Sequence, residues 1–398
     1  MTGRRRRNAA SARPRIAIVG ANFAGLRAAQ ALGNEYDVTV FDPAPWFEWL
    51  PNIHELLSGA KRPADLRLSR RRLLERAGHR FVRVAVVAID AKRGRLETST
   101  GSAHDFDACI VAVGGVNETF GVRGADRHAL PLRSVDDGEA VRRRLASLAK
   151  GRAPRSVVIV GGGFTGVEVL GEILRRYRKR QSLTIHVVDA ATRLMAGASP
   201  RIDAAVRAHC ATFDVQIHTG SPVAAVTPAG VRLQSGRRLR SDLTLWTGGG
   251  SAPPLLRAAG LAAKPRQWAP VDASLRSRRF RNVFVIGDAA GLPHPVAKQA
   301  FYALEMGECA AGNVQRMLAG RKLKSFSPSR TPLLVAFGDL DTFLVAGRSV
   351  IANSTLAAAK EAVYQVTMAQ IDPPLSAPAL GQLAGRVIGV TRRLALSR

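Results

Sequence analysis

The sequence predicts an α/β protein with two three-layer parallel-sheet domains, the second inserted into the first, followed by a C-terminal region. Three observations indicate this arrangement. An apolar run, a glycine turn and a helical pattern occur twice, and after each copy a second apolar run ends in an acidic residue. A third is the length of 398 residues, which is enough for two sizeable cores.

The first copy is "RIAIVGANFAGLRAAQAL" at 15–32, and the run after it, "YDVTVFD", ends at Asp42. Gly20 and Gly25 occupy the first and third positions of a G-x-G-x-x-G turn, whereas Asn22 occupies the middle position. Asn tolerates left-handed backbone conformations, and its amide can donate to a phosphate oxygen. We therefore interpret this segment as a modified nucleotide-binding turn; the alternative is a turn that has lost its cofactor.

The second copy, "SVVIVGGGFTGVEVLGEI" at 156–173, has all three glycines, and "LTIHVVD" after it ends at Asp189. The two acids lie 22 and 28 residues beyond the first glycines of their turns. Such a turn directs backbone N–H groups and a helix N-terminus at a pyrophosphate, while the acid reaches the adenosine ribose hydroxyls. Two copies predict two Rossmann-like dinucleotide-binding domains, one cofactor held permanently and the other exchanging.

Charge and cysteine content narrow the possible partners and chemistry. The 59 Lys and Arg against 30 Asp and Glu give a net charge of +29, which favours anionic surroundings such as phosphates, nucleic acid or a bilayer surface. Cys109, Cys210 and Cys309 are far apart in the sequence, which argues against a disulfide framework, a cysteine zinc site and an adjacent redox dithiol. We predict no metal site, and Cys109 as a buried structural thiol.

Four further segments carry a resemblance: "VTVFDPAPWFEWLPNIHELLSG" (38–59), "RFVRVAVVAID" (80–90), "DACIVAVGG" (107–115) and "NVFVIGDAAG" (282–291). With them the chain resembles the type II NADH dehydrogenases, single-chain NADH:quinone oxidoreductases among the two-dinucleotide-domain, glutathione-reductase-like FAD/NAD flavoproteins. The resemblance runs from about residue 15 to about 320 and continues more weakly to about 370.

The resemblance implies a domain order and two cofactors. An FAD-binding domain is expected at 15–117 and 251–325, with the NAD(P)H-binding domain inserted at 118–250. A disordered basic arm is expected at 1–14, and a C-terminal region at 326–398. FAD is expected to be bound tightly without a covalent bond, and NADH to exchange as co-substrate.

The cofactor positions follow from the same resemblance, with Asp288 expected to hydrogen-bond the ribityl chain of FAD. The FAD positions are Gly20, Asn22, Phe23, Ala24, Gly25, Asp42, Pro51, Val86, Ala112, Val113, Gly114, Gly287, Asp288, Gln299 and Ala300. The NADH positions are Gly161, Gly163, Phe164, Thr165, Gly166, Asp189 and Gly248.

A helix over 294–318, beginning near Pro295, is expected to point its N-terminus at the flavin N1–C2 edge and stabilise the reduced ring. Lys298 would add a positive charge there; the alternative is a solvated surface lysine. The family's A-Q-x-x-x-Q pattern is absent from this helix, which leaves the electron acceptor open. The candidate substrate contacts are Phe301, Tyr302 and Glu305.

Glu172 is the candidate catalytic side chain in the second domain, because its match in the family approaches the nicotinamide. Glu168 lies four residues earlier and shares its helix face. The alternative for Glu172 is a surface pair with Arg175 or Arg176. Asp189 predicts NADH over NADPH, since a carboxylate accepts from a 2′-hydroxyl and repels a 2′-phosphate.

Two helices are expected in the C-terminal region. One covers 353–371, with Ser354 or Thr355 as N-cap and Pro373 as stop. Its expected core-facing residues are Leu356, Ala359, Val363 and Val366. The other, at 378–398, is a basic amphipathic segment that suits an anionic membrane surface; the alternative is a disordered tail or a helix docked on another subunit. No run of about 18 uncharged apolar residues occurs.

The predicted function is hydride transfer from NADH to FAD and then two-electron transfer to a quinone, on the cytoplasmic face of the membrane. The first alternative is a reductase of the same fold acting on a soluble ferredoxin or rubredoxin. The second is a nucleic-acid-binding flavoprotein like apoptosis-inducing factor. Scattered basic residues without interleaved aromatic groups make nucleic acid an improbable partner. A homodimer stays open.

Overall fold

The structure is a computed structural model, and it describes residues 13–151, 153–179, 183–347 and 349–373. The chain forms two compact units. The first comprises the segment up to Phe47, Ser69–Gly115 and Ala252–Pro328. The second comprises Glu48–Leu68, Val116–Ser251 and the segment from Ser329. The sequence assigned 48–68 to the FAD-binding domain, whereas here its helix α2 (Glu55–Ser58) packs on α5 (Val135–Lys150) and α6 (Phe164–Tyr177) of the second unit.

A five-stranded parallel sheet forms the centre of the first unit, in the order β21-β9-β1-β2-β5. Its strands are rich in β-branched residues and buried on both faces, as expected for a parallel sheet. The strands are β1 (Arg15–Val19), β2 (Asp37–Phe41), β5 (Arg80–Val82), β9 (Ala108–Val111) and β21 (Val283–Val285).

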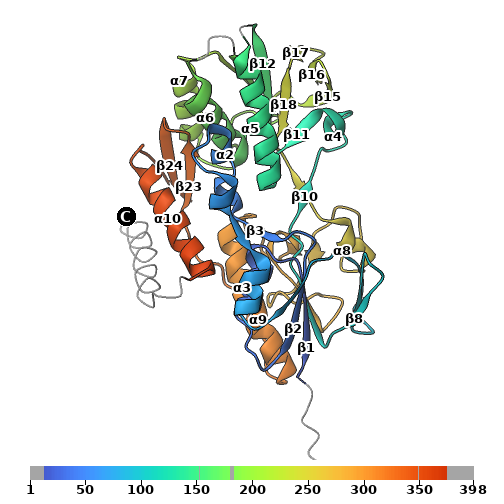
Figure 1. Cartoon of the computed structure of the whole chain (residues 1–398). Helices are drawn as coiled ribbons and strands as arrows, with labels where there is room; N and C mark the ends of the chain where they lie inside the picture. The colour runs from blue at the N-terminus through green and yellow to red at the C-terminus, as the bar shows by residue number, and fades with distance from the viewer. Residues whose placement is uncertain (1–12, 152, 180–182, 348, 374–398) are drawn as a thin grey trace, which may run out of the picture. The chain divides into compact units, whose positions relative to one another are not determined.

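Helices α1 (Phe23–Gln30) and α9 (Ala300–Leu318) pack closely against each other in this unit. Helix α9 is labelled in Figure 1. A Cβ atom at Gly307 would lie 2.4 Å from the carbonyl oxygen of Ala24, so this approach requires glycine. The other elements are α3 (Arg70–Arg76), β6 (Val86–Asp90), β7 (Arg95–Thr98), β8 (Ala103–Asp105), α8 (Pro254–Ala258), β20 (Ala269–Pro270), η3 (Gly287–Ala289) and β22 (Ala290–Gly291). β6, β7 and β8 form an antiparallel sheet.

The second unit repeats the central arrangement, with a five-stranded parallel sheet in the order β11-β18-β12-β13-β14. The strands are β11 (Ala129–Pro131), β12 (Arg155–Val160), β13 (Leu183–Val188), β14 (Val215–His218) and β18 (Leu243–Trp246). The remaining elements around it are η1 (Leu50–Asn52), η2 (Pro63–Leu66), β10 (Val116–Asn117), α4 (Ala125–His128), α7 (Pro200–Cys210), β15 (Val223–Thr227), β16 (Gly230–Leu233), β17 (Arg238–Arg240) and β19 (Gly250–Ser251). The short strands β3 (Trp46–Glu48) and β4 (Arg67–Ser69) pair with each other.

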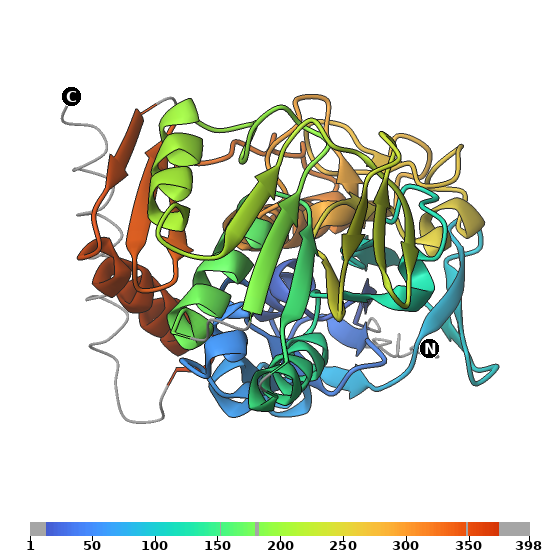
Figure 2. The same ribbon diagram turned by 90° about the horizontal axis from the view of Figure 1, so that it is seen from above.

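The C-terminal part of the second unit is an antiparallel sheet followed by a helix. Strands β23 (Leu333–Phe337), β24 (Asp341–Ala346) and β25 (Ser349–Ala352) lie beside α10 (Leu356–Ile371), drawn in orange to red in Figure 2. A Cβ atom at Gly171 would lie 2.4 Å from the amide nitrogen of Gly338, so α6 approaches the turn after β23 closely. In the described residues no helix is long and apolar enough to cross a membrane. The predicted amphipathic segment 378–398 lies outside the described residues.

Two expectations about helices are wrong. Helix α9 begins at Ala300 with Gln299 as N-cap and not near Pro295, so the segment around Lys298 is non-helical. Helix α10 has the expected extent, with Thr355 as N-cap, but buries Lys360, Tyr364 and Ile371, while Val363 is exposed. Polar contacts determine which side of α10 faces inward. The Tyr364 hydroxyl donates to the carbonyl of Asp65, and Lys360 pairs with Glu168.

Candidate functional site

The two glycine turns make the same hydrogen bonds, one set in each unit. The amide of the first glycine donates to the last residue of the second strand, from Gly20 to Phe41 and from Gly161 to Val188, both at 2.8 Å. The next amide donates to the predicted ribose acid, from Ala21 to Asp42 at 2.8 Å and likewise from Gly162 to Asp189. The repeat seen in the sequence is therefore a repeat of structure.

Close backbone contacts explain the first and third glycines of each turn. A Cβ atom at Gly25 would lie 1.8 Å from the Gly20 carbonyl oxygen, and one at Gly166 would lie 1.8 Å from that of Gly161. In contrast, a Cβ atom at Gly163 would meet no atom within 4 Å. The middle position therefore faces open space, as a turn that cradles a phosphate requires.

The reason given for Asn22 is wrong in one respect. Asn22 has φ −94° and ψ −151°, and Gly163 has φ −76° and ψ −166°, so both residues are extended N-caps. The middle position needs no left-handed backbone, and any residue can adopt its conformation. The predicted phosphate beside this position would restrict only the volume of the side chain.

The two acids differ in their surroundings. Asp42 accepts from the amide of Ala44 at 2.9 Å and also pairs with the guanidinium of Arg70, which is buried. The same guanidinium donates to the carbonyl of Ala21 at 2.9 Å. Asp42 is thereby held rigidly at the end of β2.

Asp189 accepts from the amide of Ala191 at 2.7 Å, in the same way as Asp42 accepts from Ala44. Arg193 is turned toward its own loop, where it donates to the carbonyls of Met195 and Ala196 at 3.3 and 2.6 Å. Its guanidinium is therefore held by backbone carbonyls of its own loop, whereas the described hydrogen bonds of Asp189 come from backbone amides.

Most of the predicted FAD positions lie together in the first unit, at the carboxyl ends of parallel strands, where ligands bind in such sheets. Residues 20–25 follow β1, Asp42 follows β2, residues 112–114 follow β9, and Gly287 and Asp288 follow β21. Val86 opens β6 in the same unit, whereas Pro51 lies in η1 of the second unit. These assignments stay predictions.

A cavity of about 190 Å³ lies between the end of β21 and the start of α9, and its lining includes Gly287, Asp288, Gln299 and Tyr302. Lys298 also lines it; its ammonium donates to the carbonyls of Asp288 and Ala290 at 2.6 and 2.9 Å. The ring of Trp268 lies 4.3 Å from the same ammonium. The ammonium of Lys298 is therefore bound to backbone carbonyls of the segment after β21.

The three candidate substrate contacts are divided along α9. Tyr302 lines the cavity near Gln299, and its ring packs edge-on to that of Phe301. Glu305 instead lines a different cavity of about 860 Å³, which extends along the C-terminal half of α9. Tyr302 and Glu305 therefore line different cavities, so the three candidates do not line one shared cavity.

The predicted NADH positions also share one edge of their sheet. Residues 161–166 follow β12, Asp189 follows β13 and Gly248 follows β18. The hydroxyl of Thr247 donates to the carbonyls of Val160 and Gly161, both at 3.0 Å, and holds this third segment against the turn. The NADH assignments of these residues stay predictions.

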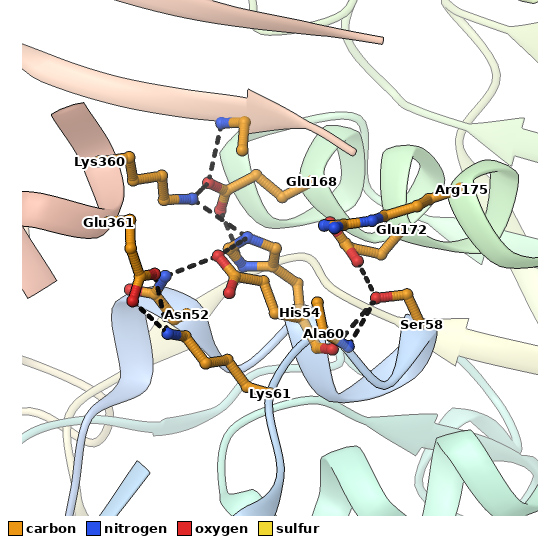
Figure 3. A network of polar contacts seen from close by, with 12 residues as sticks. Asn52, His54, Ser58, Ala60, Lys61, Glu168, Glu172, Arg175, Lys360 and Glu361 are labelled. Carbon is orange, nitrogen blue, oxygen red and sulfur yellow. Dashed lines mark hydrogen bonds and ion pairs between the residues drawn. The ribbon is translucent and has the colours of Figure 1, made fainter. Parts of the chain in front are cut away.

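Glu172 lies inside the second unit and is not a surface residue (Figure 3). Its side chain is 1% exposed and hydrogen-bonds the hydroxyl of Ser58 from α2, while Arg175 approaches at 3.5 Å from the outside. Burial raises the pKa of the Glu172 carboxyl, and Ser58 and Arg175 oppose that shift. A buried carboxyl with a raised pKa is suited to hold a proton.

Glu168, one turn earlier on α6, has a different environment (Figure 3). It accepts from the ammonium of Lys360 at 2.7 Å and from the amide of Ala336 at 3.3 Å, and its other oxygen lies 3.4 Å from Nδ1 of His54. Lys360 also lies 3.1 Å from Nε2 of His54. Burial, and then Lys360, hold the pKa of His54 well below its usual value. A neutral imidazole with Nδ1–H toward Glu168 and the lone pair of Nε2 toward Lys360 fits these two contacts.

The sequence profile of the pyridine nucleotide-disulphide oxidoreductases matches residues 14–307 of this chain. The chain belongs to the pyridine nucleotide-disulphide oxidoreductase family. The prediction that it is an oxidoreductase enzyme is thereby confirmed. All three cysteines are free thiols, and burial raises the pKa of the fully buried Cys109 to about 12.

The chain is similar to the type II NADH:quinone oxidoreductase of Staphylococcus aureus, with 26% identity over 343 residues, which cover 79% of this chain and 85% of the relative. In fold it is similar to NDH2 from Plasmodium falciparum, at a TM-score of 0.81 and 15% identity, over 96% of this chain and 98% of that one. The sulfide:quinone oxidoreductase of Aquifex aeolicus gives a TM-score of 0.80 at 16% identity, over 90% and 91% of the two chains. The predicted resemblance and fold class are confirmed.

Sequence reasoning missed four buried polar residues of this family member: His54, Ser58, Arg70 and Lys360. The signal available for His54 and Ser58 was their place in 38–59, a segment already singled out for its resemblance. Arg70 lies in a run of three arginines, and Lys360 lies among small apolar residues, so neither differs locally from a surface residue.

We expect Glu172→Gln to raise the melting temperature at pH 8 and to change it little at pH 5. The folded-state pKa of Glu172 is raised above the ordinary 4.5, so its contribution is favourable below that value and is lost as pH rises through the folded pKa. Gln keeps a hydrogen bond to Ser58 and never ionises. Thermal unfolding of both proteins across this pH range measures the difference; a variant that becomes less stable as pH rises would contradict the assignment.

Proposed function

We propose that the chain is an NADH dehydrogenase that passes a hydride from NADH to bound FAD and then two electrons to a quinone. The observation that carries the proposal is the repeated turn, in which an acid is fixed by a backbone amide of the turn in both copies. In the second copy the middle position, Gly163, also opens onto free space. Two such turns in one chain suit two dinucleotides. The S. aureus relative named for this activity supports the same conclusion.

The first unit would hold FAD. Its turn offers the amides around Asn22 to the pyrophosphate, Asp42 would accept from the adenosine ribose, and Asp288 from the ribityl chain. The left-handed φ of +64° at Gly287 fits a sharp turn beside a bulky ring. Bound FAD supplies the two-electron chemistry, accepting a hydride and releasing electrons to the acceptor.

The second unit would bind NADH, with the pyrophosphate at residues 161–166 and the adenosine ribose at Asp189. Because Asp189 has no arginine partner among its described hydrogen bonds and Arg193 is held by carbonyls, a 2′-phosphate would meet an uncompensated carboxylate. We therefore infer a preference for NADH over NADPH.

Glu172 would assist the nicotinamide half-reaction as the buried proton-holding group of the second unit. We expect Glu172→Ala to slow NADH-dependent flavin reduction at least tenfold, on the order of the 10²–10⁴ contributed by a general acid or base. Stopped-flow absorbance of the flavin under anaerobic conditions measures the rate. Unchanged reduction kinetics in Glu172→Ala would remove the residue from the site.

The whole function is tested by anaerobic mixing of the purified yellow protein with NADH and then with a soluble quinone. We expect the flavin absorbance near 450 nm to bleach with NADH, to bleach more slowly with NADPH, and to return on quinone addition. A colourless protein that cannot be reconstituted with FAD would overturn the proposal. Reoxidation by a ferredoxin or rubredoxin and not by quinone would favour the soluble-carrier alternative.

We also propose peripheral attachment at the cytoplasmic face of the membrane through 378–398. The support is the basic amphipathic pattern of that segment and the net charge of +29, since an anionic surface attracts each nearby Lys or Arg by about 1 kcal/mol.

A further inference from the structure

Phe120 is an exposed aromatic residue in a backbone conformation that L-residues rarely adopt. Its side chain is 67% exposed, and its φ is +53°. Such strain persists only where neighbouring contacts fix it, and it concentrates at functional sites. Neither a buried ring nor a relaxed loop explains this residue, so its place in the second unit needs a reason.

Two interactions of Glu118 fix the strained residue. The Glu118 carboxylate accepts from the amide of Phe120 at 2.7 Å, and the Glu118 carbonyl accepts from the indole N–H of Trp246 at 2.9 Å. Trp246 is the last residue of β18. The loop after β10 is therefore attached to the carboxyl end of the sheet.

The ring of Phe120 lies over the segment that follows β18. Two of its carbons are 2.6 Å from the position a Cβ atom would take at Gly249, whose φ is +78°. The preceding residue, Gly248, lies against the first glycine of the turn, with its nitrogen 2.8 Å from the position of a Cβ at Gly161. The ring, the segment 247–249 and the glycine turn are thus contiguous.

The strand order decides which half of a dinucleotide reaches this ring. β12, which carries the glycine turn, lies between β13, which ends at Asp189, and β18. A dinucleotide with its adenosine ribose at Asp189 and its pyrophosphate at the end of β12 extends its other half over the end of β18. That half is the nicotinamide nucleoside.

We propose that Phe120 is a binding residue for the nicotinamide ring of NADH, its exposed side chain packing against that ring. This inference rests on the proposed NADH site of the second unit. The ring supplies apolar and π contact to a flat heterocycle, and the strained backbone presents it away from the core. The adenosine and pyrophosphate contacts do not depend on it.

Calorimetric titration of the FAD-loaded protein with NAD⁺ and with ADP-ribose, which lacks only the nicotinamide, tests the proposal. We expect Phe120→Ala to weaken NAD⁺ binding about tenfold and to leave ADP-ribose binding within about twofold of wild type. Phe120→Tyr should bind both as wild type does. Ile351→Ala, which trims another exposed apolar side chain of the same unit, serves as the matched control.

Phe120→Gly separates binding from folding, because glycine adopts a positive φ without strain. We expect it to be at least as stable as wild type and still to lose affinity for NAD⁺. Equal weakening of both ligands, or of neither, would overturn the role of the ring. A wild-type protein that binds neither ligand would instead overturn the proposed NADH site.

Discussion

Replacing Lys360 by Met is expected to lower the free energy of unfolding of the second unit by about 3–5 kcal/mol, the usual cost of removing one partner of a buried ion pair. Lys360 is 8% exposed, and its ammonium bonds both Glu168 and His54. Without it, Glu168 keeps only the Ala336 amide and the His54 imidazole as donors among its described contacts. Urea unfolding followed by circular dichroism measures the loss.

Two variants control this experiment. Arg142→Met breaks a half-exposed pair with Glu139 on α5 and should cost less than about 1 kcal/mol. The double variant Lys360→Met/Glu168→Gln removes both charges and should recover part of the lost stability, since no uncompensated carboxylate remains. A Lys360→Met protein as stable as Arg142→Met would show that the pair contributes nothing.

Gly166→Ala is expected to lower NADH-dependent flavin reduction at limiting NADH about 10- to 100-fold, while the flavin content stays that of wild type. A methyl group there would lie 1.8 Å from the Gly161 carbonyl, so the turn must open, at about 1–3 kcal/mol for overpacking of this kind. Stopped-flow reduction over a range of NADH concentrations separates a loss of affinity from a loss of rate.

Gly163→Asn is the matched control, because it gives the second turn the residue that the first turn carries as Asn22. Its backbone is extended and a Cβ atom there meets nothing, so folding should be unaffected and reduction should fall only a few-fold. If the flavin of Gly166→Ala is reduced as fast as that of Gly163→Asn, the close approach of Gly166 to the Gly161 carbonyl is not needed for the reaction with NADH.

Local patterns account for what the sequence predicted well. Each strand, glycine turn and helix follow one another directly in the sequence, so neighbouring residues specify them. Asp42 and Asp189 come directly after the strands that pair with β1 and β12. The start of α9 was predicted too early because Pro295 suits a first helical turn. The segment 295–299 forms no helix or strand, and Lys298 donates to carbonyls after β21.

Long-range polar contacts account for what the sequence did not predict. Lys360 is 192 positions from Glu168 and 306 from His54, and no periodicity within α10 signals either partner. Arg70 lies 28 positions after Asp42, at the start of α3, and no local pattern links the two residues. The apolar residues of α10 were predicted to face the core. The buried face instead contains Lys360, which pairs with Glu168.

The order of the strands also governs how the protein can fold as it leaves the ribosome. All five strands of the second sheet lie between 129 and 246, so this sheet can close once that stretch has emerged. The first sheet has four strands by residue 111 but waits for β21, which pairs with β9, until residue 285 is made. During synthesis, β9 presents a bare apolar edge for more than 170 residues, and this is where a nascent chain would need a chaperone.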